Sequence, residues 1–176
     1  LPHSVSTLIT FDDLPEATTN DYSAVTNGYA GLTWNNFAVM AGDVIAAKSG
    51  TNGSGFLAGI VSPDNIVFNP EAQPAYISNS APFNFVSAYL TAAWDDYLWV
   101  QVEGFAGDVM IYSNTCILSA TNPTLIQFSY QSVTKVYFNS FGETRHSGYT
   151  GSGEQFVMDN VLIDTNAPPE IHGIDF

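Results

Sequence analysis

The apolar residues of this chain come in short runs that turn-forming residues interrupt. The runs are rich in Val, Ile, Phe and Tyr, and no segment of 12 or more residues has a helical apolar period free of glycine and proline. This pattern is typical of strands. We expect strands at Leu8–Phe11, Leu32–Val39, Ile66–Phe68, Phe83–Ala92, Leu98–Glu103, Val109–Tyr112, Leu125–Tyr130, Lys135–Phe138 and Phe156–Ile163. So many strands predict an all-β fold of two packed antiparallel sheets, a β-sandwich or jelly roll.

The length of 176 residues fits one domain. A chain of this size buries roughly two-thirds of the surface of its unfolded state, so it needs no disulfide framework. Its single cysteine, Cys116, has no partner within the chain. We expect one β-sandwich domain over residues 1–165 and a tail over residues 166–176. The Gly- and Ser-rich segments 52–55 and 147–153 are expected to be loops.

The charge of the chain limits its partners. Seventeen acidic side chains stand against 3 basic ones, which gives a formal net charge of −14. Nucleic-acid binding needs clustered Lys and Arg, so we expect no nucleic-acid partner and, for the same reason, no membrane partner. The negative field also repels polyanionic polysaccharides, which leaves neutral glycans as the favoured partner class. We also expect a monomer.

The start of the sequence indicates a compartment. The chain begins Leu1-Pro2-His3 without a methionine, which is typical of a mature secreted protein whose signal peptide has been removed, although a shortened chain would begin in the same way. One sequon, Asn52-Gly53-Ser54, lies in an expected loop and would accept a glycan in that compartment. We therefore expect secretion to the extracellular space.

One expected strand alternates strictly between two kinds of side chain. Three aliphatic residues occupy one face, and two aromatic and two polar residues occupy the other: Leu98, Val100 and Val102 against Tyr97, Trp99, Gln101 and Glu103. The second set would form a row with a spacing of roughly 6.5–7 Å. An aromatic ring stacks on the apolar face of a pyranose, while an amide and a carboxylate bind its hydroxyl groups.

We expect this row to bind glycan, with Gln127 and Tyr137 on other strands extending the surface. The alternative is an ordinary solvent-facing sheet surface that happens to carry two aromatic side chains, or a surface that a loop covers.

An acidic residue inside the last apolar strand, Asp159, needs compensation. Burying an unpaired carboxylate costs on the order of several kcal/mol, and the chain has only 3 cationic side chains. Because the terminal strands of a sandwich often run side by side, we expect a structural calcium ion held by Asp12 or Asp13, Asp159 and oxygen atoms of the turn that contains Asn27. The alternative is that these carboxylates accept backbone N–H groups or face water.

Five segments resemble those of a group of small secreted fungal proteins: Phe11–Leu14, Asn27–Phe37, Ser87–Leu90, Val102–Phe105 and Gln155–Val161. More loosely, they resemble bacterial extracellular β-sandwich proteins of the carbohydrate-binding-module type, whose terminal strand closes with a similar Phe-x-x-Asp-Asn pattern. The match spans most of positions 8–163. The resemblance implies a jelly-roll fold, secretion and often a calcium ion near Asp159, but no activity.

A catalytic role is the second interpretation. Glycoside hydrolysis generally needs two carboxyl groups about 5 to 9.5 Å apart. Glu103 is the candidate on the row described above, and its partner would be Asp95, Asp96 or Glu154. The sequence has no nucleophile elbow, phosphate loop or dinucleotide fingerprint.

A loop of the chain carries the residue types of a β-elimination site, namely Arg145, His146 and Tyr149. The charge of −14 disfavours the uronate substrate of such a lyase.

Taken together, these patterns predict a secreted, calcium-stabilised β-sandwich that binds a neutral glycan of cell-wall type. The alternatives are a small extracellular polysaccharide-degrading enzyme and a structural or interaction protein of a cell surface.

Overall fold

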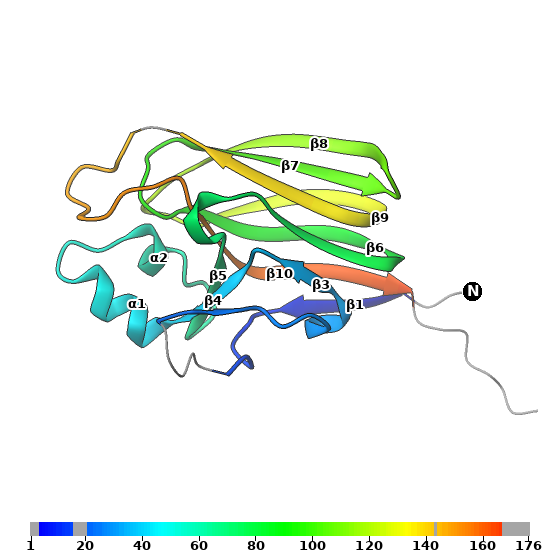
Figure 1. Ribbon diagram of the computed structural model, residues 1–176, viewed down its shortest axis with the longest axis horizontal. Coiled ribbons are helices and arrows are strands. Elements are labelled where there is room, and N and C mark those ends of the chain that lie inside the picture. The colour runs from blue at the N-terminus through cyan, green and yellow to red at the C-terminus, as the bar shows by residue number, and fades with distance from the viewer. Residues whose placement is uncertain (1–3, 16–20, 143, 167–176) are drawn as a thin grey trace, which may run out of the picture.

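The computed structural model describes residues 4–15, 21–142 and 144–166. Of the tail expected over residues 166–176, only residue 166 lies within this range. Ten strands and two short helices form most of it (Figure 1). The elements are β1 (Ser4–Ile9), β2 (Ser23–Ala24), β3 (Thr33–Asn35), β4 (Ala38–Ala41), α1 (Gly42–Ser49), α2 (Gly55–Ala58), β5 (Asn65–Phe68), β6 (Ala75–Ala92), β7 (Leu98–Ala106), β8 (Val109–Leu118), β9 (Thr124–Phe141) and β10 (Phe156–Asn166), with single 3-10 turns at Tyr29–Gly31 and Pro70–Ala72. The predicted all-β class is confirmed.

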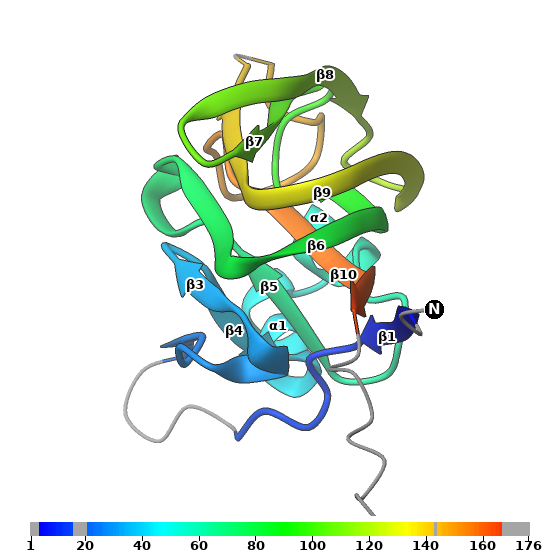
Figure 2. The same cartoon turned by 90° about the vertical axis from the view of Figure 1, so that its right-hand side faces the viewer.

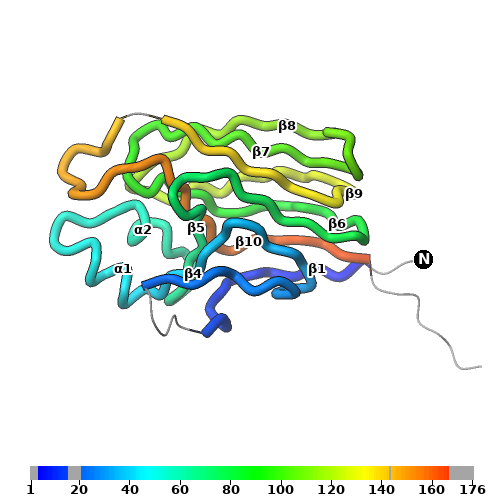
Figure 3. The backbone as a smooth tube through the Cα atoms, viewed as in Figure 1, coloured from blue at the N-terminus to red at the C-terminus, as the bar shows by residue number. Residues whose placement is uncertain are grey.

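Two long strands, β6 and β9, belong to both layers of the sandwich. Residues 75–78 of β6 pair with residues 135–138 of β9, and residues 83–90 pair with residues 124–133. Between these legs the register shifts, and Ser129 and Ser132 have positive φ angles of 54° and 55°. Such irregularities bend a strand sharply. Figures 2 and 3 show both strands turning over at one end of the molecule.

The bends divide the hydrogen-bonded strands into two antiparallel layers. The first sheet has the order β3-β6-β9-β7-β8, and it contains the later leg of β9. The second sheet has the order β2-β4-β5-β10-β6-β9, with β1 also paired to β10. The expectation that the terminal strands run side by side is thus confirmed.

Aromatic side chains fill the space between the sheets. Phe138 of the first sheet stacks on Phe156 of the second, with ring centroids 5.5 Å apart, and meets Phe85 edge-on at 6.0 Å. All three rings are fully buried. Burial of a side chain of this size stabilises the fold by about 1.5–3 kcal/mol. This core holds the first sheet in place and leaves its other face to solvent.

A second, smaller core lies on the outer face of the second sheet, under α1 and α2. Its buried members are Ala38, Met40, Ile45, Phe56, Ile66, Phe68, Ala93 and Val157. Neither helix is predicted from the sequence, because they have only 8 and 4 residues, too few for an apolar period to show. Ser54 caps α2 by accepting a hydrogen bond of 3.2 Å from the Leu57 amide.

Several strand limits differ from the expected ones. The first strand lies earlier, at Ser4–Ile9, and Phe11 after it has a positive φ of 63°. Asn36, with a φ of 53°, divides the expected strand Leu32–Val39 into β3 and β4. The two strands expected at 125–130 and 135–138 are the two legs of β9.

Candidate functional site

The outer face of β7 carries the predicted row of side chains. Leu98, Val100 and Val102 point into the core and are fully buried. Trp99 points the other way and is 44% exposed, and Gln101 and Glu103 beside it are half-buried. Because no described part of the chain covers Trp99, this row remains open to a ligand.

Each residue of the row has a neighbour on both adjacent strands. On β9, Phe141, Asn139 and Tyr137 lie opposite Trp99, Gln101 and Glu103, and on β8 the same three residues face Ile117, Thr115 and Ser113. Directly opposite residues of antiparallel strands share one face of the sheet. These nine side chains form one surface, which we call the Trp99 face.

One end of the Trp99 face is apolar. The rings of Trp99 and Phe141 are nearly parallel, with an angle of 17° and a centroid distance of 6.3 Å. Phe141 is 41% exposed, and Ile117 on the other side of Trp99 is exposed as well. An offset arrangement of this kind is favourable for two aromatic rings, and it holds their apolar surfaces in a fixed orientation.

The middle of the Trp99 face is polar. The Gln101 amide donates a hydrogen bond of 2.8 Å to the Glu103 carboxylate. This contact orients both groups and leaves acceptor capacity on each of them. Asn139 and Tyr137, next to them on β9, make no side-chain hydrogen bond among the described residues. The four polar groups can therefore exchange water for the hydroxyl groups of a ligand.

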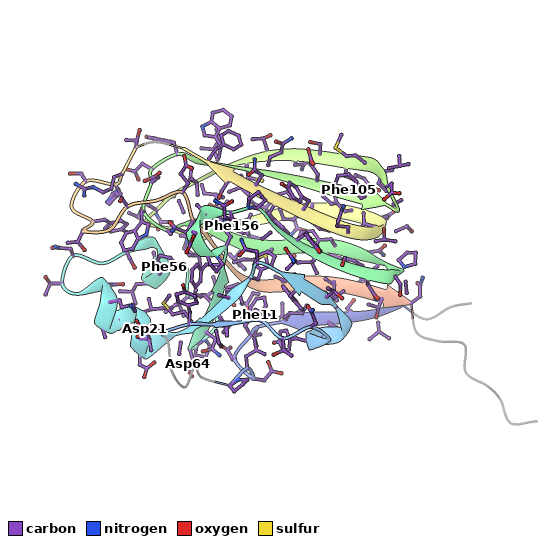
Figure 4. All side chains as sticks on the ribbon, viewed as in Figure 1. Phe11, Asp21, Phe56, Asp64, Phe105 and Phe156 are labelled. Carbon is purple, nitrogen blue, oxygen red and sulfur yellow. The ribbon has the colours of Figure 1, made fainter. Side chains whose placement is uncertain are left out.

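The row continues beyond Glu103 to Phe105, which lies opposite Lys135 of β9. The Lys135 ammonium stands 4.5 Å from the centre of the Phe105 ring, a cation–π contact. Figure 4 shows Phe105 toward the end of the molecule opposite the helices. From Trp99 to Phe105 the strand rises about 20 Å, at roughly 3.3 Å per residue.

Two residues of the predicted site are not among the nine strand-paired residues of this surface. Tyr97 precedes β7 in a turn with a φ of 59°, and its side chain is 75% exposed, so strand alternation does not apply to it. Gln127 lies in the first leg of β9, opposite Ser87 of the second sheet, whereas Tyr137 lies in the other leg. The bend in β9 thus separates Gln127 from Trp99.

The carboxylate of Asp159 is completely buried, as the sequence indicates, and hydrogen-bond donors surround it. Its Oδ2 atom accepts the amides of Val61 and Ser62 at 2.8 and 3.0 Å, and Oδ1 accepts the amide of Asn160 at 2.7 Å and the Ser62 hydroxyl at 3.2 Å. Removal from water nevertheless raises the pKa of Asp159 to about 6. In this structure N–H groups therefore provide the compensation for which we expected a metal.

The other three predicted calcium ligands have hydrogen-bond partners elsewhere. Asp12 accepts the amide of Asn65 at 2.9 Å, Asp13 accepts the Tyr29 hydroxyl at 2.6 Å, and Asn27 accepts the amide of Trp34 at 2.9 Å. Asp12 and Asp13 line different cavities. Among the described residues, no group of three or more His, Cys, Asp or Glu side chains could hold a metal ion. Calcium stays a prediction.

The carboxyl groups considered for catalysis lie far from Glu103. Asp95 and Asp96 precede β7, and Glu154 accepts the amide of Gly142, just after the end of β9, at 2.8 Å. Five strand residues, or about 16 Å, separate Glu103 from Leu98. That separation exceeds the range of a glycosidase pair. Burial raises the pKa of Asp95, and so do the nearby carboxylates of Glu154 and Asp96. These three acids therefore lie close together, at the end of β7 that is opposite to Glu103.

The three residues considered for a lyase lie in the same region, in the loop between β9 and β10. His146 Nδ1 contacts both carboxylate oxygens of Asp96 at 2.9 Å, and its ring packs on Tyr149 with centroids 4.5 Å apart. The Tyr149 hydroxyl donates to the Ala120 carbonyl at 2.7 Å, and burial raises its pKa. These contacts hold the loop in place, and they disfavour Tyr149 as a base.

Apart from Tyr137, the β8 and β9 members of the Trp99 face were not predicted from the sequence. The alternation expected at Lys135–Phe138 continues to residue 141, and extending it would have found Asn139 and Phe141. Their position next to Trp99 depends on strand register, for which the sequence carries no local signal.

Comparison with known proteins supports the fold. No family model matches the chain, and no curated protein matches it. Among solved structures, a DUF4465 family protein from Bacteroides caccae is similar, with 10% sequence identity and a TM-score of 0.57 over 90% of this chain and 98% of that chain. A DUF4465 family protein from Bacteroides ovatus shares 11% identity with a TM-score of 0.52 over 93% of this chain and 99% of that chain.

A weaker match is TmCBM61 in complex with β-1,4-galactotriose, with 8% identity and a TM-score of 0.36 over 85% of this chain and 100% of that chain. At 10% and 11% identity, the similarity to the two DUF4465 family proteins shows the fold alone. Separately, none of the described helices has the length and hydropathy of a membrane-spanning segment.

Proposed function

We propose that the Trp99 face binds a neutral glycan and that the protein acts as a carbohydrate-binding β-sandwich. The observation that carries this proposal is the exposed, nearly parallel pair of Trp99 and Phe141 beside the polar side chains of Gln101, Glu103 and Asn139. A pyranose ring has an apolar face, which stacks on an aromatic ring, and hydroxyl groups, which need directed hydrogen bonds. This row offers groups of both kinds.

The row favours an extended chain of sugars over a single one. Its length of about 20 Å from Trp99 to Phe105 runs along one strand, and polar groups line its middle. The net charge of −14 favours a neutral polymer. A cell-wall-type polysaccharide fits this description, and secretion belongs to the proposal because such a polymer lies outside the cell.

A binding screen tests the proposal directly. Wild-type protein is applied to an array of neutral oligosaccharides and polysaccharides, and hits are measured by isothermal titration calorimetry. We expect Trp99→Ala to lower the affinity at least tenfold, because it removes the largest stacking surface, about 1.4 kcal/mol or more. Leu125→Ala is the matched control, since Leu125 is 45% exposed on the second sheet. Absence of any glycan hit, or full affinity in Trp99→Ala, would refute the proposal.

The same samples separate binding from catalysis. Each glycan that binds is incubated with wild-type protein and with Glu103→Gln, and released reducing ends are measured. We expect no product, because about 16 Å of strand separates Glu103 from the candidate acids at the start of β7. Product from the wild type that is lost in Glu103→Gln, with binding retained, would replace the proposed binding function with the enzymatic interpretation.

A further inference from the structure

A cavity of about 210 Å³ lies at the helical end of the molecule, away from the Trp99 face. It is open to solvent on one side, and residues of α1, β4 and β5 line it together with Tyr22, Trp94 and the start of α2. Figure 4 shows Phe56 in this region, with Asp21 nearby. Its apolar walls are Tyr22, Met40, Ile45, Phe56, Phe68 and Trp94. A cavity with aromatic walls and few polar groups is the usual form of a small-molecule site.

The aromatic walls are held in place by one another and by the backbone. Phe56 meets Phe68 and Trp94 edge-on, at centroid distances of 5.1 and 5.5 Å, and Tyr22 meets Phe68 at 5.3 Å. The Gly55 amide at the start of α2 donates to the Ala93 carbonyl at 2.8 Å. The cavity therefore does not need to form when a ligand arrives, which lowers the free-energy cost of binding.

Two buried hydroxyl groups in the cavity leave one hydrogen without an acceptor. Ser49 and Ser54 are 4% and 2% exposed, both line the cavity, and their oxygens lie 2.6 Å apart. Ser54 also accepts the Leu57 amide. One of the two hydroxyl hydrogens forms the bond between the serines, and the other has no acceptor among the described residues. A ligand that fills the cavity without offering an acceptor excludes water from this donor and leaves it unpaired, at a cost of about 1–3 kcal/mol.

The charges at the cavity favour an uncharged ligand. Among the described residues that line the cavity, only Lys48 is cationic, and its ammonium is already paired with the carboxylate of Asp21. The chain as a whole repels anions through its charge of −14. A ligand thus gains from aromatic contact and from one hydrogen bond, and it gains nothing from a negative charge.

We propose that this cavity binds a small uncharged aromatic molecule with one oxygen acceptor. The ring packs among Phe56, Phe68 and Trp94, and the oxygen accepts the free hydroxyl hydrogen of the Ser49–Ser54 pair. The size is suitable, since an engineered protein cavity of about 150 Å³ is large enough to bind benzene. This site is independent of the glycan-binding proposal.

Two probes of similar shape test the ligand class. Acetophenone carries a ring and a carbonyl acceptor, and ethylbenzene lacks the acceptor. We expect acetophenone to shift the indole N–H resonance of Trp94 saturably in NMR spectra, with little effect on Trp34 and Trp99. Ethylbenzene should bind about five- to tenfold more weakly, because it leaves the serine hydrogen unpaired. No saturable shift at Trp94, or equal affinity for both probes, would overturn the proposal.

Variants of α1 test the location. Ser49→Leu fills the cavity and removes one hydroxyl, so acetophenone should no longer shift Trp94. Ala47→Leu, an exposed position on the same helix, is the matched control and should bind as the wild type does. Met40→Phe fills the cavity from the sheet side and serves if Ser49→Leu does not fold. Binding that persists unchanged in a folded cavity-filling variant contradicts the proposed location.

Discussion

Trp99 and Phe141 lie side by side on β7 and β9, with ring centroids 6.3 Å apart and planes inclined by 17°. Neither ring belongs to the hydrophobic core, because 44% and 41% of their residue surfaces are exposed. Their orientation follows from the pairing of β7 with β9, because the alternate side chains of both strands point to the other side of the sheet and are buried in the core. The pair therefore offers solvent a rigid apolar surface.

Phe141 should contribute to glycan binding together with Trp99. Replacing it by Ala removes the ring that orients the indole, an interaction of about 0.5–1.5 kcal/mol, so we expect Phe141→Ala to weaken glycan affinity about two- to tenfold. Calorimetry against the same glycan measures the effect, with Leu125→Ala as control. Unchanged affinity in Phe141→Ala, when Trp99→Ala has lost binding, would show that the indole acts alone.

The stability of the protein should depend on pH through Asp159. The native carboxyl has a pKa of about 6, because burial raises it from its ordinary value, whereas in the unfolded chain it titrates near pH 4, roughly. Between these two pH values the native state binds more protons than the unfolded state. The contribution of Asp159 to the free energy of unfolding therefore decreases as pH rises from about 4 to about 6, and it is constant above.

Urea denaturation of wild type and Asp159→Asn at pH 4, 5, 6 and 7 measures this contribution. The variant cannot titrate at this position. The unfolding free energy of the wild type minus that of the variant should therefore decrease between about pH 4 and pH 6. A difference that is independent of pH would mean that the buried carboxyl has an ordinary pKa.

Calcium can be tested by its removal. A structural ion stabilises only the folded state, so a chelator should lower the Tm of calcium-loaded protein by several degrees. Protein with chelator and excess calcium is the control, and it should melt as the untreated sample does. If the three melting curves coincide, the N–H donors around Asp159 are sufficient and calcium has no structural role there.

Gly55 should tolerate no side chain. A Cβ at this position would lie 1.7 Å from the carbonyl oxygen of Ala92, so Gly55→Ala must displace α2 from the second sheet. We expect a loss of about 1–3 kcal/mol or more in urea denaturation. Because Phe56 moves with α2, acetophenone binding should be lost as well.

Gly142→Ala is the matched control for Gly55→Ala. Its Cβ would lie 3.2 Å from the Cδ1 atom of Leu98, the end of a side chain that can move, and 3.4 Å from the Cα atom of the same residue, which is an ordinary contact distance. A stability loss as large as that of Gly55→Ala would contradict the steric explanation.

The composition of the Trp99 face was predictable only in part. Alternation correctly separates Trp99, Gln101 and Glu103 from the three aliphatic residues between and before them, because side-chain direction along a strand is a local property. The same reasoning holds for Tyr137, which lies opposite Glu103, but it fails for Gln127. Both lie on β9, and the bend around Ser129–Ser132 places them in different sheets.

Asp159 shows the same limit for a buried charge. The sequence correctly indicates that a carboxylate in an apolar strand needs compensation, since its burial is costly. The compensating groups are mainly backbone amides of residues 61, 62 and 160. Every residue except proline has such an amide, so no pattern of residue types could have identified them.

The sequence by itself determined the all-β class, the two faces of β7 and the need to compensate the burial of the Asp159 carboxylate, because each depends on residues close together in the chain. Tertiary structure alone decided that Phe141 lies beside Trp99, that Gln127 lies elsewhere, and that two short helices contribute to the lining of an aromatic cavity. Those arrangements depend on strand register, on sharp bends and on the approach of distant backbone segments, and the free energy that selects them comes from packing the whole chain.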